Sequence, residues 1–149
     1  MELTTFGAGC FWEVERAFQR IDGVISTKVG YAGGYKENPT YQEVCQNNTG
    51  YAEVVQVEFN ARKVSYEKLL EIFWKIHNPT LVDKQGFDVG AQYRSAIFYH
   101  SEMQKNAAEI SLELEQRKYK EKIATKVEPL KNFYLAEDYH QKYLDKKGL

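Results

Sequence analysis

The spacing of apolar and polar residues along the chain predicts alternating strands and helices. The clearest strand pattern covers 52–60, where Val55, Val57 and Phe59 face one way, opposite the residues between them. The clearest helix follows Ser65, a residue type that caps helix starts, and its apolar residues recur at helical spacing to about His77. By the same reasoning we expect strands over 3–6, 24–31, 52–60, 95–100 and 124–128, and helices over 10–20, 65–77, 102–118 and 136–144.

The order of these elements, β-α-β-β-α-β-α-β, points to an α/β (α+β) architecture. The first six match a ferredoxin-like βαββαβ core, a two-layer sandwich with helices on one face of a mainly antiparallel sheet. An extra helix and strand follow this core toward the C-terminus. The segments 35–50 and 80–92 are expected to be loops. With no repeat or linker between the elements, we expect residues 1–149 to form one domain.

Composition and charge narrow the class of protein. The formal net charge is −1, so nothing suggests the phosphate contacts of a nucleic-acid-binding protein. The sequence has no apolar run long enough to span a membrane and no signal-peptide pattern at its start. Two cysteines are too few for a disulfide framework, so we expect a cytoplasmic location with free thiols. Aromatic residues are frequent, at 14% with 11 tyrosines, and phenols can line a polar pocket.

Cys10 is the first candidate for chemistry because it lies where a strand turns into a helix. Free N–H groups and the partial positive charge of a helix start favour a thiolate, which is the reactive form of cysteine. Gly7 and Gly9 leave room for a substrate beside the sulfur. The alternatives are that Cys10 is a small buried hydrophobic residue, and that Phe11 and Trp12 only anchor the helix to the sheet.

Six short motifs give the chain a resemblance to a known family. They are GCFW at 9–12, GYAGG at 30–34, NPTY at 38–41, TGYAE at 49–53, GAQYRS at 90–95 and AEDYHQ at 136–141. In this order and spacing they resemble the peptide-methionine sulfoxide reductase A family over essentially the whole chain. The chain departs from the family pattern at Tyr51 for histidine, Phe87 for asparagine, Ala91 for threonine and Asn78 for aspartate.

The resemblance implies a fixed set of roles in reducing a sulfoxide. A thiolate attacks the sulfur, an acid protonates the oxygen, and a pocket orients the methyl group. The implied nucleophile is Cys10 and the implied acid is Glu53. Tyr41 and Tyr93 would donate hydrogen bonds to the oxygen, Phe11 and Trp12 would hold the methyl group, Asp88 would orient a water, and Tyr143 would line the rim. The family reduces the S epimer at sulfur, so we expect the same preference here.

The residues alone leave other interpretations of these positions open. Glu53 could be an ordinary carboxylate at a strand edge, and Asp88 could cap a turn. Tyr41 and Tyr93 could be core rings with satisfied hydroxyl groups. The three histidines show no metal-ligand spacing, so no metal site is expected, and His140 is read as structural.

Regeneration of the thiol is where the sequence departs most from the resembled family. Most members carry a glycine-rich C-terminal segment with resolving cysteines, and the 149-residue sequence shows only Cys45 besides Cys10. We therefore expect a Cys10 sulfenic acid that an external thiol system reduces, either glutaredoxin with glutathione or thioredoxin, without a bound cofactor. Cys45 as an unusual resolving residue stays open.

Two other classes of function remain to be separated from this hypothesis. Another cysteine enzyme, such as a one-cysteine peroxidase or a hydrolase, would consume peroxide or cleave esters. A non-catalytic ferredoxin-like binding module would leave Cys10 unreactive toward iodoacetamide at neutral pH. The expected partners are free methionine sulfoxide, oxidised proteins and the thiol reductant, with no nucleic acid and no membrane.

Overall fold

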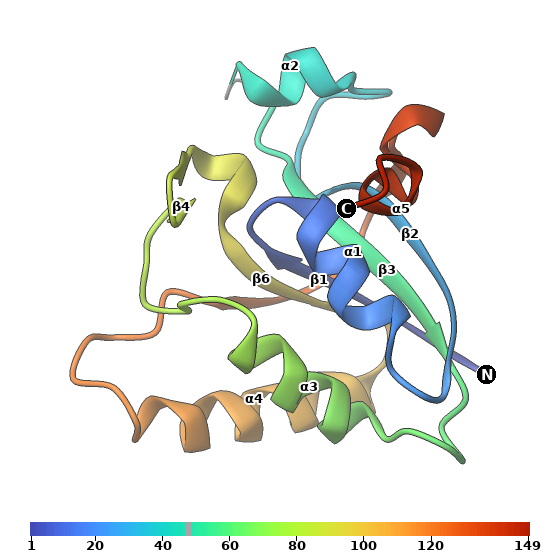
Figure 1. Ribbon diagram of the computed structural model, residues 1–149. Coiled ribbons are helices and arrows are strands. Elements are labelled where there is room, and N and C mark those ends of the chain that lie inside the picture. The colour runs from blue at the N-terminus through green and yellow to red at the C-terminus, as the bar shows by residue number, and fades with distance from the viewer. Residues whose placement is uncertain (47–48) are drawn as a thin grey trace.

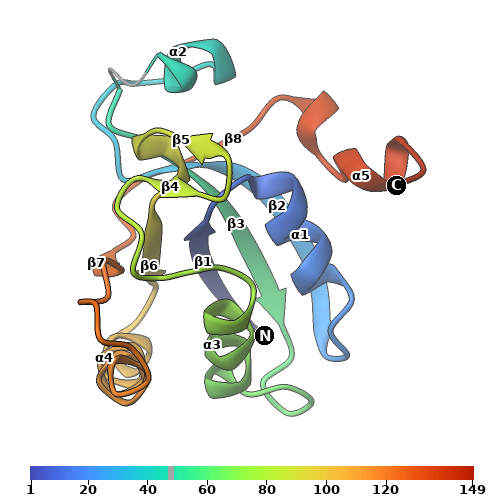
Figure 2. The same ribbon diagram turned by 60° about the vertical axis from the view of Figure 1, so that its left-hand side comes forward.

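A computed structural model describes residues 1–46 and 49–149 and contains a curled mixed sheet with helices packed on it (Figures 1 and 2). The sheet has six strands in the order β7-β6-β1-β3-β2-β8. The strands are β1 Glu2–Ala8, β2 Val24–Ala32, β3 Ala52–Phe59, β6 Ser95–Tyr99, β7 Lys126–Pro129 and β8 Phe133–Leu135, and a separate hairpin joins β4 Lys84–Gln85 to β5 Asp88–Val89. The helices are α1 Phe11–Gln19, α2 Tyr41–Cys45, α3 Tyr66–Lys75, α4 Glu102–Gln116 and α5 Tyr143–Lys146, with two 3₁₀ turns, η1 Ala91–Tyr93 and η2 Asp138–His140.

The connectivity confirms the ferredoxin-like prediction. The four core strands lie in the order β6-β1-β3-β2, and every neighbouring pair among them is antiparallel. The extra helix α4 leads to β7, which pairs parallel to β6 at one edge. At the other edge β8 pairs antiparallel to β2, and this short strand was not predicted.

The helices cover one face of the sheet, and the larger core lies under them. Phe6 of β1 stacks on Phe18 of α1 and on Phe73 of α3, each with ring centroids 5.1 Å apart. The predicted alternation in β3 holds, because Val55 and Val57 point into this core while Val54 joins a smaller cluster on the opposite face. The sequence pattern thus fixes which side of β3 meets the helices, and Glu53 lies on that same side.

The structure corrects the expectations for three segments. The predicted loop 35–50 contains α2, which begins with a capping box between Thr40 and Glu43. The predicted loop 80–92 contains the β4–β5 hairpin and η1. The predicted helix 136–144 is wrong, because η2 and α5 are separated by Lys142 in the left-handed conformation, at φ 56°. The hydrogen bonds of Lys142 with Glu15 and Thr27 outweigh the local helix propensity of this segment.

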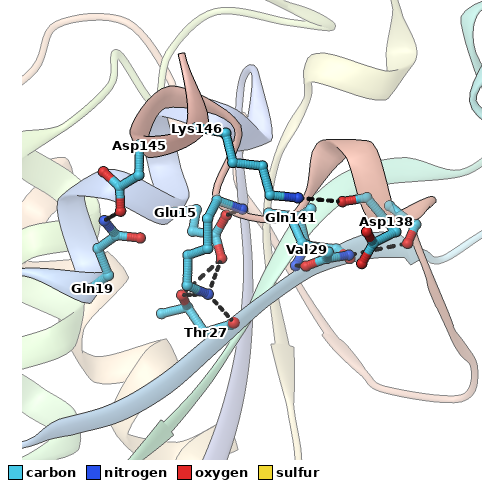
Figure 3. Close-up of polar contacts among 10 residues, drawn as sticks. Glu15, Gln19, Thr27, Val29, Asp138, Gln141, Asp145 and Lys146 are labelled. Carbon is cyan, nitrogen blue, oxygen red and sulfur yellow. Dashed lines mark hydrogen bonds and ion pairs between the residues drawn. The ribbon is translucent and has the colours of Figure 1, made fainter. Parts of the chain in front are cut away.

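Residues 136–149, here called the C-terminal strap, are tied to β2 and α1 by polar contacts (Figure 3). The Gln141 side chain accepts from the Val29 N–H over 3.0 Å and donates to the Val29 carbonyl over 2.9 Å. The Lys142 ammonium reaches the buried Glu15 carboxylate at 2.8 Å and the Thr27 carbonyl at 2.7 Å. These bonds hold the strap against β2 and against α1, the helix whose N-cap is Cys10.

No helix in the described part of the chain is long and apolar enough to cross a membrane.

Candidate active site

The backbone turns sharply between the end of β1 and the start of α1, and this turn presents Cys10. Gly9 has φ 101°, a conformation that favours glycine, and a Cβ added there would lie 3.0 Å from Cβ of Gln85. Cys10 is the N-cap residue of α1, and its carbonyl accepts from the Val14 N–H over 3.3 Å. Glycine at position 9 therefore lets the β4–β5 hairpin approach the cysteine closely.

The thiol of Cys10 is partly buried, and burial raises its pKa to about 12. A hydrogen bond from the Trp12 backbone N–H acts in the opposite direction, whereas the negative charges of Glu53, Asp88 and Glu13 raise the pKa further. The helix start favours a thiolate through the Trp12 N–H, as expected, but this effect is too small to set the protonation of the free protein. Burial and neighbouring carboxylates outweigh the helix start, and the thiol is protonated at neutral pH.

Glu53 of β3 lies directly beside the cysteine and is almost completely buried, with 1% of its surface exposed. Its Oε1 accepts a hydrogen bond from the Phe11 N–H over 3.2 Å, and its Oε2 has no partner among the described residues. Burial raises the pKa of Glu53 to about 8, despite the hydrogen bond from Phe11. The side chain is therefore a neutral carboxylic acid near pH 7, with one oxygen unpaired.

The two predicted tyrosines approach the same carboxyl group from different elements. Tyr41 begins α2, and its ring stacks on Phe11 with centroids 6.3 Å apart. Tyr93 ends η1. Burial raises the pKa of Tyr41 and raises that of Tyr93 to about 12, and the charge of Glu53 adds to both shifts. Both hydroxyls thus stay protonated at neutral pH and keep a proton to donate.

The aromatic side of the site is built by α1 and the C-terminal strap. The Trp12 ring stacks on Tyr143 with centroids 3.8 Å apart, and its Nε1–H donates to Nδ1 of His140 over 2.9 Å. His140 is completely buried, and its ring also contacts Phe11 and Tyr41 at centroid distances of 5.1 and 4.3 Å. The orientation of Trp12 is thus set by two residues of the strap.

All eight residues predicted for the site converge on one region. Asp88, at the start of β5, is exposed, and its charge raises the pKa of Cys10, Glu53 and Tyr93. Tyr143 stacks on Trp12, and its place at the rim of the pocket stays a prediction. The structure gives the positions of these residues, and their catalytic roles stay predictions.

Sequence reasoning missed the residues that hold this site in place. Glu137 accepts from the Tyr31 hydroxyl over 2.8 Å and from the Tyr41 N–H over 2.9 Å. Burial acts to raise the pKa of Glu137. The hydrogen bonds from the Tyr41 N–H and the Tyr31 hydroxyl outweigh burial, so the pKa is lowered overall. The motif AEDYHQ contains Glu137, His140 and Gln141. Only His140 was expected to be structural, and the other two were present only as part of the family resemblance.

Cys45, the second thiol, also lies at this site. It ends α2, is partly exposed, and its thiol hydrogen-bonds with Tyr41 and Gln92. Burial raises its pKa, and the charge of Glu53 contributes. Cys45 was expected in a loop. It lies instead at the end of α2, next to Tyr41, one of the predicted catalytic tyrosines.

Comparisons with known proteins agree with this geometry. A family model described as peptide methionine sulfoxide reductase matches residues 2–148. The peptide methionine sulfoxide reductase MsrA of Methanothermobacter thermautotrophicus is 56% identical over 147 residues, which cover 97% of this chain and 87% of that protein. The solved structure of methionine sulfoxide reductase A of Corynebacterium diphtheriae superposes with a TM-score of 0.96 at 36% identity, covering 99% of this chain and 76% of that one. Mxr1 from Saccharomyces cerevisiae in complex with Trx2 gives a TM-score of 0.68 at 32% identity, covering 95% and 84%.

Proposed function

Because the chain belongs to the peptide methionine sulfoxide reductase family, a family of oxidoreductases, we propose that it reduces methionine S-sulfoxide to methionine with Cys10 as the nucleophile. Free and protein-bound sulfoxides are both substrates in this proposal. One observation supports it above the others: a buried, neutral Glu53 with an unpaired oxygen lies against the first N–H of the helix that carries the cysteine.

The proposed reaction moves one oxygen atom and two electrons. The Cys10 sulfur attacks the sulfoxide sulfur, and the sulfur–oxygen bond of the substrate breaks. The oxygen ends on Cys10 as a sulfenic acid, and the substrate leaves as a thioether. The cysteine sulfur is oxidised by two electrons and the substrate sulfur is reduced by two.

Glu53 supplies the proton that makes the oxygen a better leaving group and regains it at the end of the step. Its raised pKa keeps this proton available at pH 7, and its neutral form no longer repels a negative Cys10. Tyr41 and Tyr93 donate to the same oxygen. The Cys10 proton leaves only when a sulfoxide is present to take up charge, and it restores the neutral Glu53 once that carboxyl group has given its own proton to the oxygen. This coupling accounts for a nucleophile with such a high pKa in the free protein.

The two walls of the site differ in chemistry, and this difference supports a preference for one epimer. Phe11 and Trp12 provide an apolar side for the methyl group, whereas Glu53, Tyr41 and Tyr93 provide the donors for the oxygen. A sulfoxide sulfur is a pyramidal centre, so only one epimer can satisfy both walls with its sulfur facing Cys10. Comparable rates on resolved R and S substrates would contradict this assignment.

We propose that an external thiol regenerates Cys10 and that the electrons come from no bound cofactor. One thiol attacks the sulfenic acid to give a mixed disulfide and water, and a second thiol releases Cys10. The complex of the relative Mxr1 with Trx2 supports a thioredoxin as reductant, and glutaredoxin with glutathione is the other candidate. Free thiols in both cysteines are compatible with the cytoplasmic location that we propose.

A single-turnover experiment tests this proposal. After one turnover with methionine S-sulfoxide and no reductant, mass spectrometry with dimedone trapping should find one sulfenic acid, on Cys10. Cys10→Ser should abolish turnover, and Glu53→Gln should slow it roughly 10²–10⁴-fold. Wild-type activity should also fall as pH rises through about 8, where Glu53 loses its proton.

Three outcomes would contradict the proposal. A Cys10–Cys45 disulfide after one turnover, lost together with activity in Cys45→Ser, would show internal resolution. Full activity of Glu53→Gln would place the acid elsewhere. Peroxide consumption or ester hydrolysis without sulfoxide reduction would favour another cysteine enzyme. Slow alkylation by iodoacetamide no longer identifies a binding module, because a thiol with a pKa of about 12 reacts slowly in either case.

A further inference from the structure

The β4–β5 hairpin carries two exposed apolar side chains at the edge of the site. Its strands are joined by a two-residue turn, Gly86 and Phe87, since Gln85 pairs with Asp88. Gly86 has φ 56° and Phe87 does not have a positive φ, which is the type II′ arrangement that matches strand twist. Phe87 is fully exposed, and Val89, two residues further, is 72% exposed.

The hairpin is held in place, so the exposure of Phe87 does not come from a loose loop. The Gln85 side chain accepts from the Asn78 N–H over 3.0 Å and donates to the Asn78 carbonyl over 2.7 Å. At the hairpin base the Gly90 N–H donates to the Asp83 carbonyl over 2.8 Å. The Phe87 ring is thus exposed to water at the tip of a hydrogen-bonded hairpin. Exposed apolar side chains that lie together often mark interaction sites.

This hairpin borders the reacting sulfur directly. Gln85 packs against Gly9, the residue before Cys10, and the neighbouring Asp88 carboxylate acts on the Cys10 thiol. Figure 2 shows β4 and β5 beside the N-terminal end of α1. An extended polypeptide advances about 3.3 Å per residue, so the residues that flank a side chain bound at Cys10 pass within reach of the hairpin tip.

The chemistry of the substrate indicates what would cover this tip. Methionine is mostly buried in proteins, so residues two to four positions away, on the same face of its strand or helix, are often apolar. Oxidation to the sulfoxide makes the side chain polar and disrupts the core around it, which exposes those neighbours. Resting on the proposed reductase function, we propose that Phe87 and Val89 bind apolar residues flanking an oxidised methionine, and so favour protein-bound substrates in locally unfolded, apolar segments.

Steady-state kinetics with three substrates and dithiothreitol as reductant test this proposal. The substrates are N-acetyl-methionine S-sulfoxide and two pentapeptides in which the S-sulfoxide is flanked by leucines or by glycines. Wild type should prefer the leucine peptide. Phe87→Gln should lower kcat/KM for that peptide roughly three- to tenfold, the value of partly burying one aromatic side chain, and leave the N-acetyl substrate unchanged. Phe87→Leu should keep most of the preference.

The matched control is Met103→Gln, which also removes an exposed apolar side chain, from the distant helix α4, and should change nothing. Equal wild-type kcat/KM on the two peptides would overturn the proposal. So would an equal loss on the N-acetyl substrate, or a Phe87→Gln defect seen only when thioredoxin replaces dithiothreitol, because the tip would then serve the reductant. Failure of wild type on all three sulfoxides would instead refute the proposed function.

Discussion

Two regions flank Cys10, and each is fixed by one glutamine amide that pairs with both backbone groups of a single residue. In the C-terminal strap Gln141 pairs with Val29, and in the β4–β5 hairpin Gln85 pairs with Asn78. The strap adds the ion pair of Lys142 with the buried Glu15, and it orients aromatic rings around the site. The hairpin instead exposes its apolar tip. The same pairing of a glutamine amide with one backbone residue therefore supports a pre-organised wall in the strap and a recognition surface in the hairpin.

Breaking the ion pair of the strap should give the largest effect. Lys142→Met leaves the Glu15 carboxylate buried without its cation, which typically costs about 3–5 kcal/mol of unfolding free energy. Urea unfolding measures this loss, and the double variant with Glu15→Met should recover part of it. A double variant as unstable as Lys142→Met would show that the left-handed backbone at position 142, rather than the charge, dominates.

Acid should destabilise the fold through His77, which lies next to the residue that holds the hairpin. His77, beside Asn78, is bonded to the Phe73 carbonyl and to Ser95, and burial lowers its pKa from 6.5 to about 4. The unfolded chain binds this proton more readily, so the stabilisation is complete above pH 6.5 and is lost as pH falls toward 4. The loss should reach roughly 3 kcal/mol, measured by urea unfolding across this range. A His77→Gln variant should show a flatter pH dependence, and an unchanged slope would contradict this origin.

The two glutamines allow a matched comparison of the regions. The bonds of Gln141 are partly buried and those of Gln85 are exposed, so Gln141→Ala should cost about 1–3 kcal/mol and Gln85→Ala less than about 1 kcal/mol. Thermal or urea unfolding of both variants in parallel checks the order. Equal losses would mean that the strap gains no advantage from burial.

The smallest expected effects are kinetic. His140→Phe keeps an aromatic ring but removes the acceptor of Trp12, which should raise KM for methionine sulfoxide several-fold with little change in kcat, the effect of about one hydrogen bond. Steady-state kinetics on the free S-sulfoxide, with His100→Gln as the control at a distant histidine, measure this. A fall in kcat with constant KM would place His140 in the chemical step instead.

The sequence predicted the core of the fold because its signals are local. The alternation of β3 and the Ser65 cap of α3 each depend on neighbours in the chain, and the structure keeps both. Six of the eight candidate site residues lie in the family motifs, and Asp88 and Tyr143 lie close to the last two of these motifs in the sequence. The hairpin was missed because its strands have two residues each, too few for a periodic signal.

The errors have long-range causes that no local pattern carries. Residues 136–144 of the strap were predicted as one helix because the two partners of Lys142 lie more than a hundred residues earlier in the chain. These partners are Glu15 and Thr27. The protonation of the Cys10 thiol was misjudged because burial by the rest of the fold outweighs the effect of the helix start. Both errors concern what a residue meets after folding.

The pairing of Gln141 and Lys142 with β2 also bears on how copies of this protein behave toward one another. Only the last three residues of β2 pair with β8, and the Val29 and Thr27 carbonyls before them receive donors from Gln141 and Lys142. Side chains thus occupy backbone groups at which an exposed edge strand would recruit a second chain. Detaching the strap should therefore produce a protein that aggregates in proportion to its concentration, even under conditions where it remains folded.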